Sequence, residues 1–323
     1  MAVKRRVAVV GGGVAGLTVA RGLSSDGHAV TVFEKARGPG GRMSTRRREA
    51  GQFDHGAQYF TARSEAFRRQ VSLWSSEGVV AKWAGPFGRW DQGQTVIEDG
   101  PEERWVGVPR MSALTRHLAD GLDIQASTRI VSLAQVDDQW RLLDSSGKAY
   151  SGFDWVILTC PGPQAAALAP VGSRVHERAA QLSYSPCWAA MLHLAAGGQP
   201  DAVALHCQHA VVAWLAHDSS KPERATSNCW VAHATAEWSE RHSEDSPDEV
   251  ALELARAVEQ MTGMAVLKAQ AHRWLYALPI GTAGGAFVME TALGLALCGD
   301  ALAGRRVESA WLSAVALLDA FRE

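Results

Sequence analysis

Three glycines near the N-terminus constrain this chain more than any other feature. Gly11, Gly13 and Gly16 follow a short apolar run and precede residues whose apolar positions recur at helical spacing. In a strand–turn–helix unit the first glycine permits a tight turn, the second lets the backbone approach a pyrophosphate, and the third lets helix and strand pack closely. Glu34 ends the next apolar run, where a carboxylate accepts hydrogen bonds from a ribose and repels a 2′-phosphate. The pattern predicts a dinucleotide-binding unit over residues 3–34.

Composition limits what the rest of the chain can be. The 323 residues are 47% apolar with a net charge of −2, which is typical of a globular protein. The 32 basic and 34 acidic residues nearly balance, so there is no excess of positive charge and we expect no nucleic-acid partner. No apolar run reaches the roughly 18 residues of a membrane span, so no membrane partner is expected. The five cysteines form no CxxC pair, which favours a cytoplasmic protein with neither a disulfide framework nor a metal site.

The middle of the chain differs from its two ends. Short strands are expected at 186–194, 202–206, 211–216 and 228–234, followed by a helix at 247–262, which favours an antiparallel sheet. Residues 84–103, rich in glycine, proline and aspartate, are expected to form an excursion. The predicted fold class is α/β, with a Rossmann-like domain and an inserted, mostly antiparallel β-sheet domain. The predicted domains are 1–75 with 100–165 and 277–323, and 76–99 with 166–276.

Two further motifs resemble the FAD-binding sequences of the flavin-containing amine oxidase superfamily. Gly40-Gly41-Arg42 follows Glu34, where a dehydrogenase would continue into its next helix, and Cys298-Gly299-Asp300 precedes a C-terminal helix. The resemblance implies non-covalent FAD as the cofactor, in a two-domain flavin amine oxidase architecture. Asp300 would then bind the ribityl or phosphate region, although an ordinary helix N-cap is the alternative. Only one GxGxxG follows a strand, which disfavours disulfide reductases and NADPH-docking monooxygenases.

Segments across the whole chain resemble the bacterial renalases. They are FDHGAQYFTA (53–62), RWVG (104–107), WLA (214–216), SKPER (220–224), HATAEWS (233–239), HRWLYA (272–277) and RVESAWLS (306–313). The resemblance implies oxidation of 2-dihydro and 6-dihydro isomers of NAD(P)H to NAD(P)+, with electrons passing to O2 to give H2O2. A dihydropyridine can give up hydride without losing an amine proton, so we assign no catalytic acid or base and expect positioning to dominate.

The resemblance also implies which residues bind the cofactor and the substrate. The expected FAD contacts are Gly11, Gly13, Val14, Ala15, Gly16, Glu34, Lys35, Gly41, Arg42, Ala57, Gln58, Tyr59, Ile130, Asp300 and Val307. The expected contacts of the dinucleotide substrate are Gln58, Tyr59, Phe60, Thr61, Trp188, Trp214, Lys221, His233 and Trp274. Structural roles remain the alternative for several of these residues. Phe60 and each tryptophan could instead be hydrophobic-core residues. Lys221 could be a solvated surface residue, and His233 a buried histidine with a hydrogen-bond partner.

Two other functions fit the same motifs. An FAD-dependent amine oxidase shares them, but its pocket commonly brackets the amine between two aromatic rings, and only four tyrosines are present. A non-catalytic protein that binds FAD or a dinucleotide is the other alternative, because binding motifs do not prove turnover.

Overall fold

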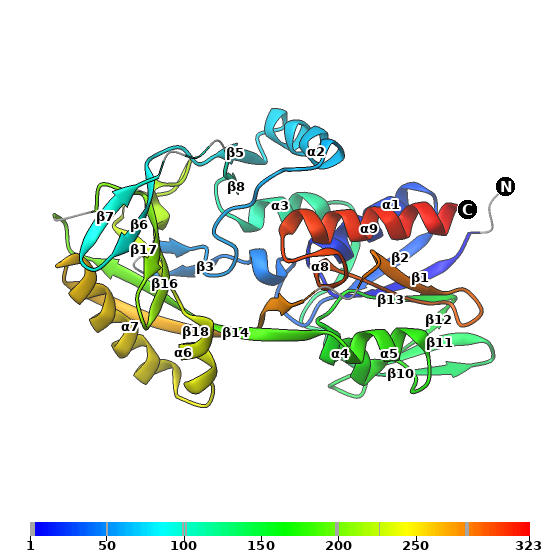
Figure 1. Ribbon diagram of the computed structural model, residues 1–323. Helices are drawn as coiled ribbons and strands as arrows, with labels where there is room; N and C mark the ends of the chain where they lie inside the picture. Colours follow the sequence, from blue (N-terminus) through cyan, green and yellow to red (C-terminus); the bar gives the residue numbers. More distant parts are fainter. Residues whose placement is uncertain are drawn as a thin grey trace.

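A computed structural model describes residues 4–49, 51–98, 100, 102–197, 200–225, 227–281 and 284–323. Two lobes are arranged side by side, and the start of β1 and the C-terminal end of α9 lie at the outer end of one of them (Figure 1). That lobe contains a mainly parallel sheet with the strand order β19-β20-β13-β1-β2-β9. Its strands are β1 (Arg6–Val10), β2 (Ala29–Phe33), β9 (Asp123–Gln125), β13 (Trp155–Leu158), β19 (Phe287–Glu290) and β20 (Leu295–Cys298). Segments far apart in sequence therefore share one sheet.

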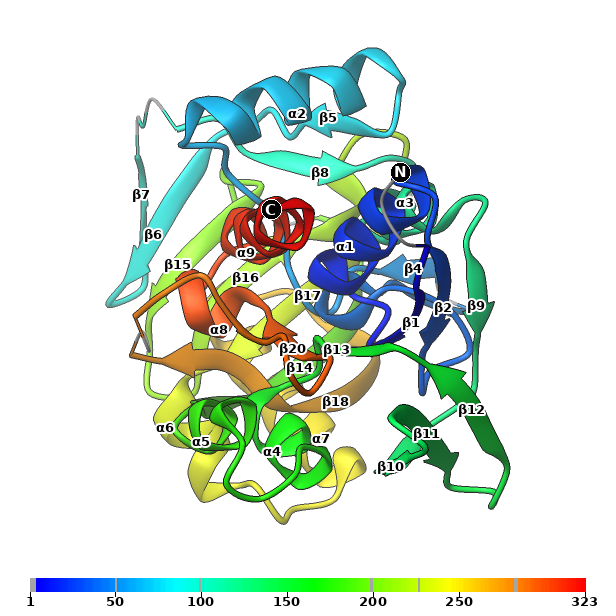
Figure 2. The same cartoon turned by 90° about the vertical axis from the view of Figure 1, so that its right-hand side faces the viewer.

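Helices α1 (Val14–Ser25) and α9 (Val307–Arg322) cover one face of this sheet (Figure 2). They pack so closely that a Cβ on Gly22 would lie 2.5 Å from Leu318 Cδ1. Helix α3 (Ser112–Ala119) lies beside α1, and the short α8 (Asp300–Ala303) precedes α9. The amide N–H of Gly299 donates to Ser313 Oγ over 2.8 Å, which ties the start of α8 to α9.

The opposite face of the parallel sheet packs on a smaller antiparallel sheet and a helix pair. Their bounds are β10 (Ile130–Val136), β11 (Gln139–Asp144), β12 (Ala149–Phe153), α4 (Gly162–Leu168) and α5 (Arg174–Ala180). Phe33, Trp140 and Leu158 meet in the core between these layers. The central strands β1, β13 and β20 are consequently buried on both faces, which explains their continuous apolar sequences.

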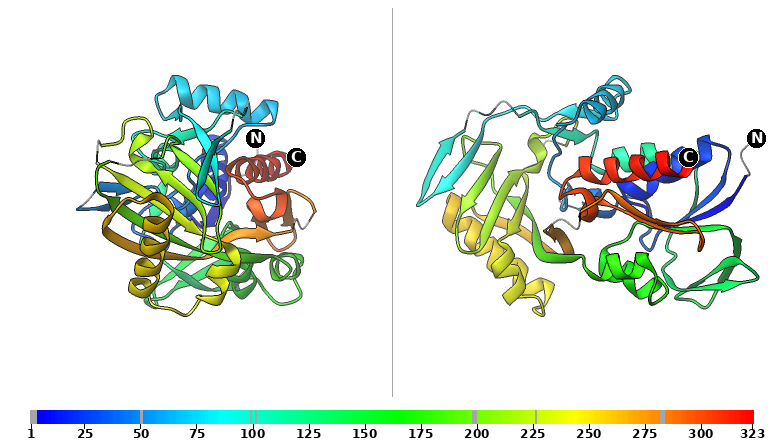
Figure 3. Two further views of the ribbon diagram at one scale, coloured as in Figure 1. Left: turned by 60° about the vertical axis from the view of Figure 1, so that its left-hand side comes forward. Right: turned by 45° about the vertical axis from the view of Figure 1, so that its right-hand side comes forward.

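The second lobe is built on a mainly antiparallel sheet with the order β18-β14-β17-β16-β15-β6-β7. The strands are β6 (Phe87–Asp91), β7 (Gln94–Ile97), β14 (Ser183–Leu194), β15 (Ala204–Gln208), β16 (Val212–His217), β17 (Cys229–Ala234) and β18 (Val266–Ile280). Helices α6 (Ala236–Arg241) and α7 (Pro247–Thr262) cover its outer face. Strands β14 and β18 extend from this lobe toward the first (Figure 3).

The remaining elements belong to none of these three sheets and are not among the helices that cover them. They are η1 (Gly41–Met43), β3 (Arg46–Arg48), β4 (Gly51–Phe53), α2 (Glu65–Ser76), β5 (Val80–Lys82), β8 (Trp105–Gly107) and η2 (Asp218–Ser220). Ser64 caps α2 by accepting from the Phe67 amide, and Phe67, Val71 and Trp74 are buried, as their spacing predicts.

The predicted α/β class with an inserted antiparallel sheet is confirmed, and one expectation needs correction. Residues 84–103, apart from 99 and 101, which lie outside the described residues, are not a simple excursion, because β6 and β7 form a hairpin in the antiparallel sheet. Its turn places Gln92 and Gly93 at positive φ, as a two-residue hairpin turn requires. Among the described residues, no helix is long and apolar enough to cross a bilayer. The predicted domain ranges stay a prediction.

Candidate cofactor and substrate sites

The glycine turn between β1 and α1 has the predicted geometry. Gly11 has φ of +120°, and its N–H donates to Phe33 O over 2.9 Å. A Cβ on Gly16 would lie 2.0 Å from Gly11 O, so only glycine allows the helix to pack this closely. A Cβ on Gly13 would meet no atom within 4 Å, because this residue faces open space at the start of α1. The turn therefore leaves room where a phosphate would meet the helix N-terminus.

Glu34 lies against this turn with its carboxylate nearly buried. Oε2 accepts from the Gly12 amide and Oε1 from the Ala36 amide, each over 2.7 Å. Since an ionised carboxylate offers about four lone-pair positions, both oxygens retain capacity to accept ribose hydroxyls. The N–H of Thr128 donates to Glu34 O over 2.9 Å, which ties the segment before β10, where Ile130 begins the strand, to Glu34; Lys35 is exposed.

The second glycine motif folds onto the first. The Gly40 N–H donates to Gly12 O over 2.9 Å, and Gly41, at φ +51°, lies close enough for a Cβ to approach Gly13 Cα within 3.4 Å. Arg42 O then accepts from the Ala57 N–H over 2.8 Å. The residues expected to run beneath the pyrophosphate and the flavin are thus brought together.

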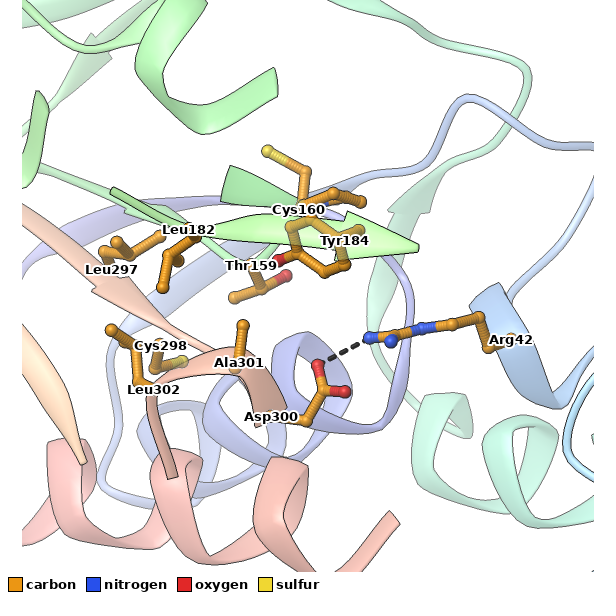
Figure 4. A pocket seen from close by; sticks show the side chains of 12 residues that line it. Arg42, Thr159, Cys160, Leu182, Tyr184, Leu297, Cys298, Asp300, Ala301 and Leu302 are labelled. Carbon is orange, nitrogen blue, oxygen red and sulfur yellow. Dashed lines mark hydrogen bonds and ion pairs between the residues drawn. The ribbon is translucent and has the colours of Figure 1, made fainter. Parts of the chain in front are cut away.

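An ion pair marks the other end of this surface. Arg42 Nη2 lies 2.5 Å from Asp300 Oδ1, beside a small cavity also lined by Thr159, Cys160 and Tyr184 (Figure 4). Burial disfavours the charged guanidinium, but attraction to Asp300 outweighs it and raises the pKa of Arg42. Gly299, not Asp300, occupies the N-cap of α8, so the expected alternative of an N-cap at Asp300 is wrong.

These features fit FAD on structural grounds. Gly13 and Gly299 both face open space in which a Cβ would meet nothing within 4 Å. Glu34 lies at one end of this surface and the Arg42–Asp300 pair at the other. Of the remaining expected contacts, Val14 and Ala15 form the first turn of α1, and Val307 begins α9.

A buried charge cluster lies next to the 54–59 segment. Lys221 Nζ is 2.5 Å from Asp218 Oδ1, 3.5 Å from Asp54 Oδ2 and 3.4 Å from Gln58 Oε1. Arg224 Nη2 donates to Asp54 Oδ2 over 2.6 Å. Burial alone would raise the pKa of Asp54, but Lys221 and Arg224 lower it, whereas burial raises the pKa of Asp218.

Lys221 is therefore neither solvated nor open to the surface. Its ammonium already interacts with the carboxylates of Asp218 and Asp54. Direct contact between Lys221 and a substrate phosphate stays a prediction, and the buried position of the side chain disfavours it. Gln58 likewise directs its amide inward, because Nε2 donates to Asp54 O and Gly56 O.

A second group combines three histidines and a tryptophan. The carbonyl oxygen of His55 interacts with His233 Nε2 at 3.2 Å and accepts from Trp274 Nε1 at 3.0 Å, and the His55 and His272 rings are 4.9 Å apart. Burial lowers the pKa of His55 to about 3 and that of His233 to about 4. Burial, with Arg46 nearby, lowers the pKa of His272 to about 4. All three imidazoles are consequently neutral near pH 7.

A third group is aromatic and lies on the inner face of the antiparallel sheet. The Tyr59 and Trp214 rings are 5.7 Å apart, and the buried Trp214 Nε1 has no hydrogen-bond partner among the described residues. Arg104 lies over the Tyr59 ring at 5.4 Å, and Lys221 over the Trp83 ring at 5.1 Å.

Three of the predicted substrate residues lie apart from these groups. Phe60 packs against Phe67 in the core, as its structural alternative states, and Thr61 is buried beside it. Trp188 lies on the outer face of the sheet, where its Nε1 donates to His242 O over 2.9 Å. The sequence did not single out Asp54, Asp218, Arg224, His55, His272 or Arg104, although all of them except Asp218 lie in the renalase-like segments.

Comparison with known proteins identifies the family. Residues 9–72 match the model of an NAD(P)-binding Rossmann-like domain, and residues 91–316, more than half of the chain, match that of the flavin containing amine oxidoreductases. The chain belongs to the flavin containing amine oxidoreductase family. It shares 45% identity over 51 residues with 4,4'-diapophytoene desaturase (4,4'-diaponeurosporene-forming) of Staphylococcus aureus strain Newman, covering 16% of this chain and 10% of the desaturase. The match thus spans about a tenth of this relative's length.

Solved structures share the fold over 98–99% of both chains. A putative protoporphyrinogen oxidase from Exiguobacterium sp. 255-15 superposes with a TM-score of 0.79 at 14% identity. A fatty acid isomerase from P. acnes gives 0.74 at 12%, and wild-type putrescine oxidase bound to putrescine gives 0.71 at 11%. Identities this low establish the fold alone.

Family membership confirms FAD as the cofactor and the flavin amine oxidase architecture. Non-covalent binding is consistent with Cys298, a buried thiol in β20 whose pKa burial raises to about 12. This protein is accordingly an FAD-dependent oxidoreductase by family.

Proposed function

We propose that this flavoenzyme is a renalase-like oxidase that converts 2-dihydro and 6-dihydro isomers of NAD(P)H to NAD(P)+. The substrate loses a hydride, and O2 takes up the two electrons and, with one further proton, becomes H2O2. Bound FAD supplies the hydride acceptor and the route of the electrons to oxygen. What the chain itself contributes is the binding and orientation of the dihydropyridine ring.

The observation that carries this proposal is the distribution of positive charge around the aromatic group. An amine substrate arrives as an ammonium ion, which binds best to an open aromatic face or an unpaired carboxylate. Here Arg104 already lies over Tyr59, and Lys221 over Trp83. The neighbouring buried carboxylates are also paired, Asp54 with Arg224 and Asp218 with Lys221. These aromatic faces and carboxylates are therefore already occupied by protein cations, which disfavours an ammonium substrate.

The neutral histidines support the same reaction class. Because the pKa values of His55 and His233 are about 3 and about 4, neither imidazole is protonated near pH 7. Hydride loss from a dihydropyridine requires no proton transfer from the substrate, so a site without an acid suffices. Tyr59 and Trp214 are placed to contact a flat ring, and the unpartnered Trp214 Nε1 could donate to a carboxamide oxygen.

An amine oxidase is the second candidate, and the Tyr59–Trp214 pair favours it. Two rings 5.7 Å apart resemble the aromatic bracket that such enzymes place around a neutral amine. The fold is also that of a putrescine oxidase, although at 11% identity.

An anaerobic flavin spectrum distinguishes these functions. The holoenzyme is mixed separately with equilibrated dihydro-NAD isomers, ordinary NADH and a panel of simple amines. We expect rapid bleaching by the isomers alone, and H2O2 when air is admitted. Bleaching by an amine alone would replace the proposal with amine oxidation, and a flavin that stays yellow throughout would favour a non-catalytic binding protein.

A matched pair of variants tests the ring contact. Trp214→Phe removes the indole N–H and keeps an aromatic ring, so the KM for the isomers should rise about two- to tenfold, the value of one hydrogen bond. Trp188→Phe makes the same change on the outer face of the sheet and should leave KM unchanged.

A further inference from the structure

A second cavity opens on the inner face of the antiparallel sheet, away from the glycine turn. It has a volume of about 430 Å³ and lies between the β3–β4 hairpin and strands β14 and β18. This volume is within the range of about 300–1,000 Å³ of small-molecule sites. None of the FAD or substrate contacts expected from the sequence lines it.

The lining combines an apolar floor with a basic rim. Phe53 and Met191 are 2% and 3% exposed and form part of a small apolar cluster. Arg48 and Lys268 line the cavity as well, together with His193. An aromatic or apolar surface beside cationic groups suits a flat heterocycle that carries phosphate.

The rim is organised by contacts between the hairpin and β18. Arg48 Nε donates to Gln270 Oε1 over 2.5 Å, and Lys268 Nζ lies 2.9 Å from Glu49 Oε2. The Lys268 and Glu49 side chains are 56% and 89% exposed, so both remain accessible to a ligand. The negative charge of Glu49 would repel an anionic ligand, and its pairing with Lys268 offsets part of that repulsion.

One face of β18 connects this cavity with the histidine–tryptophan group. Lys268, Gln270, His272 and Trp274 alternate along the strand and therefore project to the same side. Arg46 contacts His272 just as Arg48 contacts Gln270, so β3 follows this face. From Lys268 to Trp274 the strand advances by six steps of about 3.3 Å each, roughly 20 Å. A ligand that reaches both ends must be extended.

We propose that this cavity binds the adenosine diphosphate half of the dinucleotide substrate, with the purine inside the cavity, whose floor contains Phe53 and Met191, and the phosphates at Arg48 and Lys268. The proposal rests on the proposed function, since it assigns the distal half of that substrate. It concerns a nucleotide group other than that of FAD, whose expected cradle is the turn at Gly11–Gly16.

Direct binding to the holoenzyme tests the site without turnover. ADP, adenosine and inorganic phosphate are titrated calorimetrically into protein saturated with FAD. We expect ADP to bind at least tenfold more tightly than adenosine or phosphate. Lys268→Gln and Arg48→Gln should each weaken ADP binding about five- to tenfold, while Glu49→Gln should strengthen it.

Lys82→Gln is the matched control. Lys82 is also 56% exposed and paired with a glutamate, Glu103, but lies outside the cavity, so ADP binding should not change. Absence of ADP binding at millimolar concentration, or equal binding by all four variants, would overturn the site.

The two proposals can fail separately. Flavin bleaching by the isomers without ADP binding would remove this site and leave the proposed function. ADP binding that responds to Lys268→Gln, without bleaching by the isomers, would support the site and remove the function.

Discussion

Replacing Lys221 by methionine should strongly destabilise this protein. The side chain is wholly buried, and its ammonium is 2.5 Å from Asp218 and 3.5 Å from Asp54. The loss falls unequally on these carboxylates. Asp54 keeps Arg224 at 2.6 Å and the Thr45 hydroxyl at 2.6 Å, whereas Asp218 loses its closest partner. Lys221→Met therefore leaves one poorly compensated charge in the core.

Removing one partner of a buried ion pair costs about 3–5 kcal/mol, and we expect that loss in the free energy of unfolding. Asp218→Asn on the same background removes the stranded charge and should recover most of it. The effect should also depend on pH. Burial raises the pKa of Asp218 above 3.8, so in the variant its carboxylate opposes folding increasingly as pH rises above that value.

Urea unfolding of the FAD-saturated proteins at pH 5 and pH 8 measures both effects. The deficit of Lys221→Met should be larger at pH 8. Lys82→Met, which breaks an exposed pair with Glu103, should cost less than about 1 kcal/mol. If Lys221→Met stays within 1 kcal/mol of the parent while its KM for the dinucleotide rises, the buried cluster does not have the assigned role and the phosphate contact does.

Two further predictions concern the glycine turn and the histidine group. Gly16→Ala should destabilise even the apoprotein, because the Cβ of the alanine would lie 2.0 Å from Gly11 O. Gly13→Ala should fold normally but bind FAD at least tenfold more weakly, because its Cβ would project into the space expected for the phosphate. Urea unfolding measures the first effect and fluorescence titration with FAD the second, and a Gly13→Ala variant with the parent's FAD affinity would contradict the assigned phosphate site. Burial lowers the pKa values of His55 and His233 from 6.5 to about 3 and about 4, so their contribution to stability is complete above pH 6.5 and is lost as pH falls toward 4, by about 1.4 kcal/mol per pH unit for each histidine. Unfolding between pH 7.5 and 5 should show this slope in the parent protein and a shallower one in His233→Gln, and a flat profile in the parent would refute the assignment.

The cofactor end of the molecule was predictable because its determinants are local. Gly11, Gly13 and Gly16 lie within six residues, and the closest contact of a Cβ on Gly16, 2.0 Å from Gly11 O, lies inside the same strand–turn–helix unit. Glu34 directly follows β2, the next strand of the same unit. Short-range sterics therefore fixed this geometry before any tertiary contact had to be known.

The hairpin at residues 87–97 was missed for a different reason. Its turn residues, Gln92 and Gly93, carry a recognisable signal, but glycine, proline and aspartate around them favoured a loop. Strand β6 pairs in parallel with β15, more than a hundred residues later. The partner strand that turns this segment into sheet is not visible in its local sequence.

The charge cluster shows most clearly where local patterns stop being informative. Asp54 and Lys221 are 167 residues apart in the sequence. Considered alone, each is a charged residue of the kind that usually lies on a protein surface. Two cations and two carboxylates are stable in the core only as a nearly complete set, because any one alone would pay the full desolvation of a charge. The cluster ties the 54–59 segment to the loop after β16, so it holds Gln58 and Tyr59 against the inner face of the antiparallel sheet. If the proposed function is right, the charges beside the substrate ring position that segment, and they need not touch the ring at all.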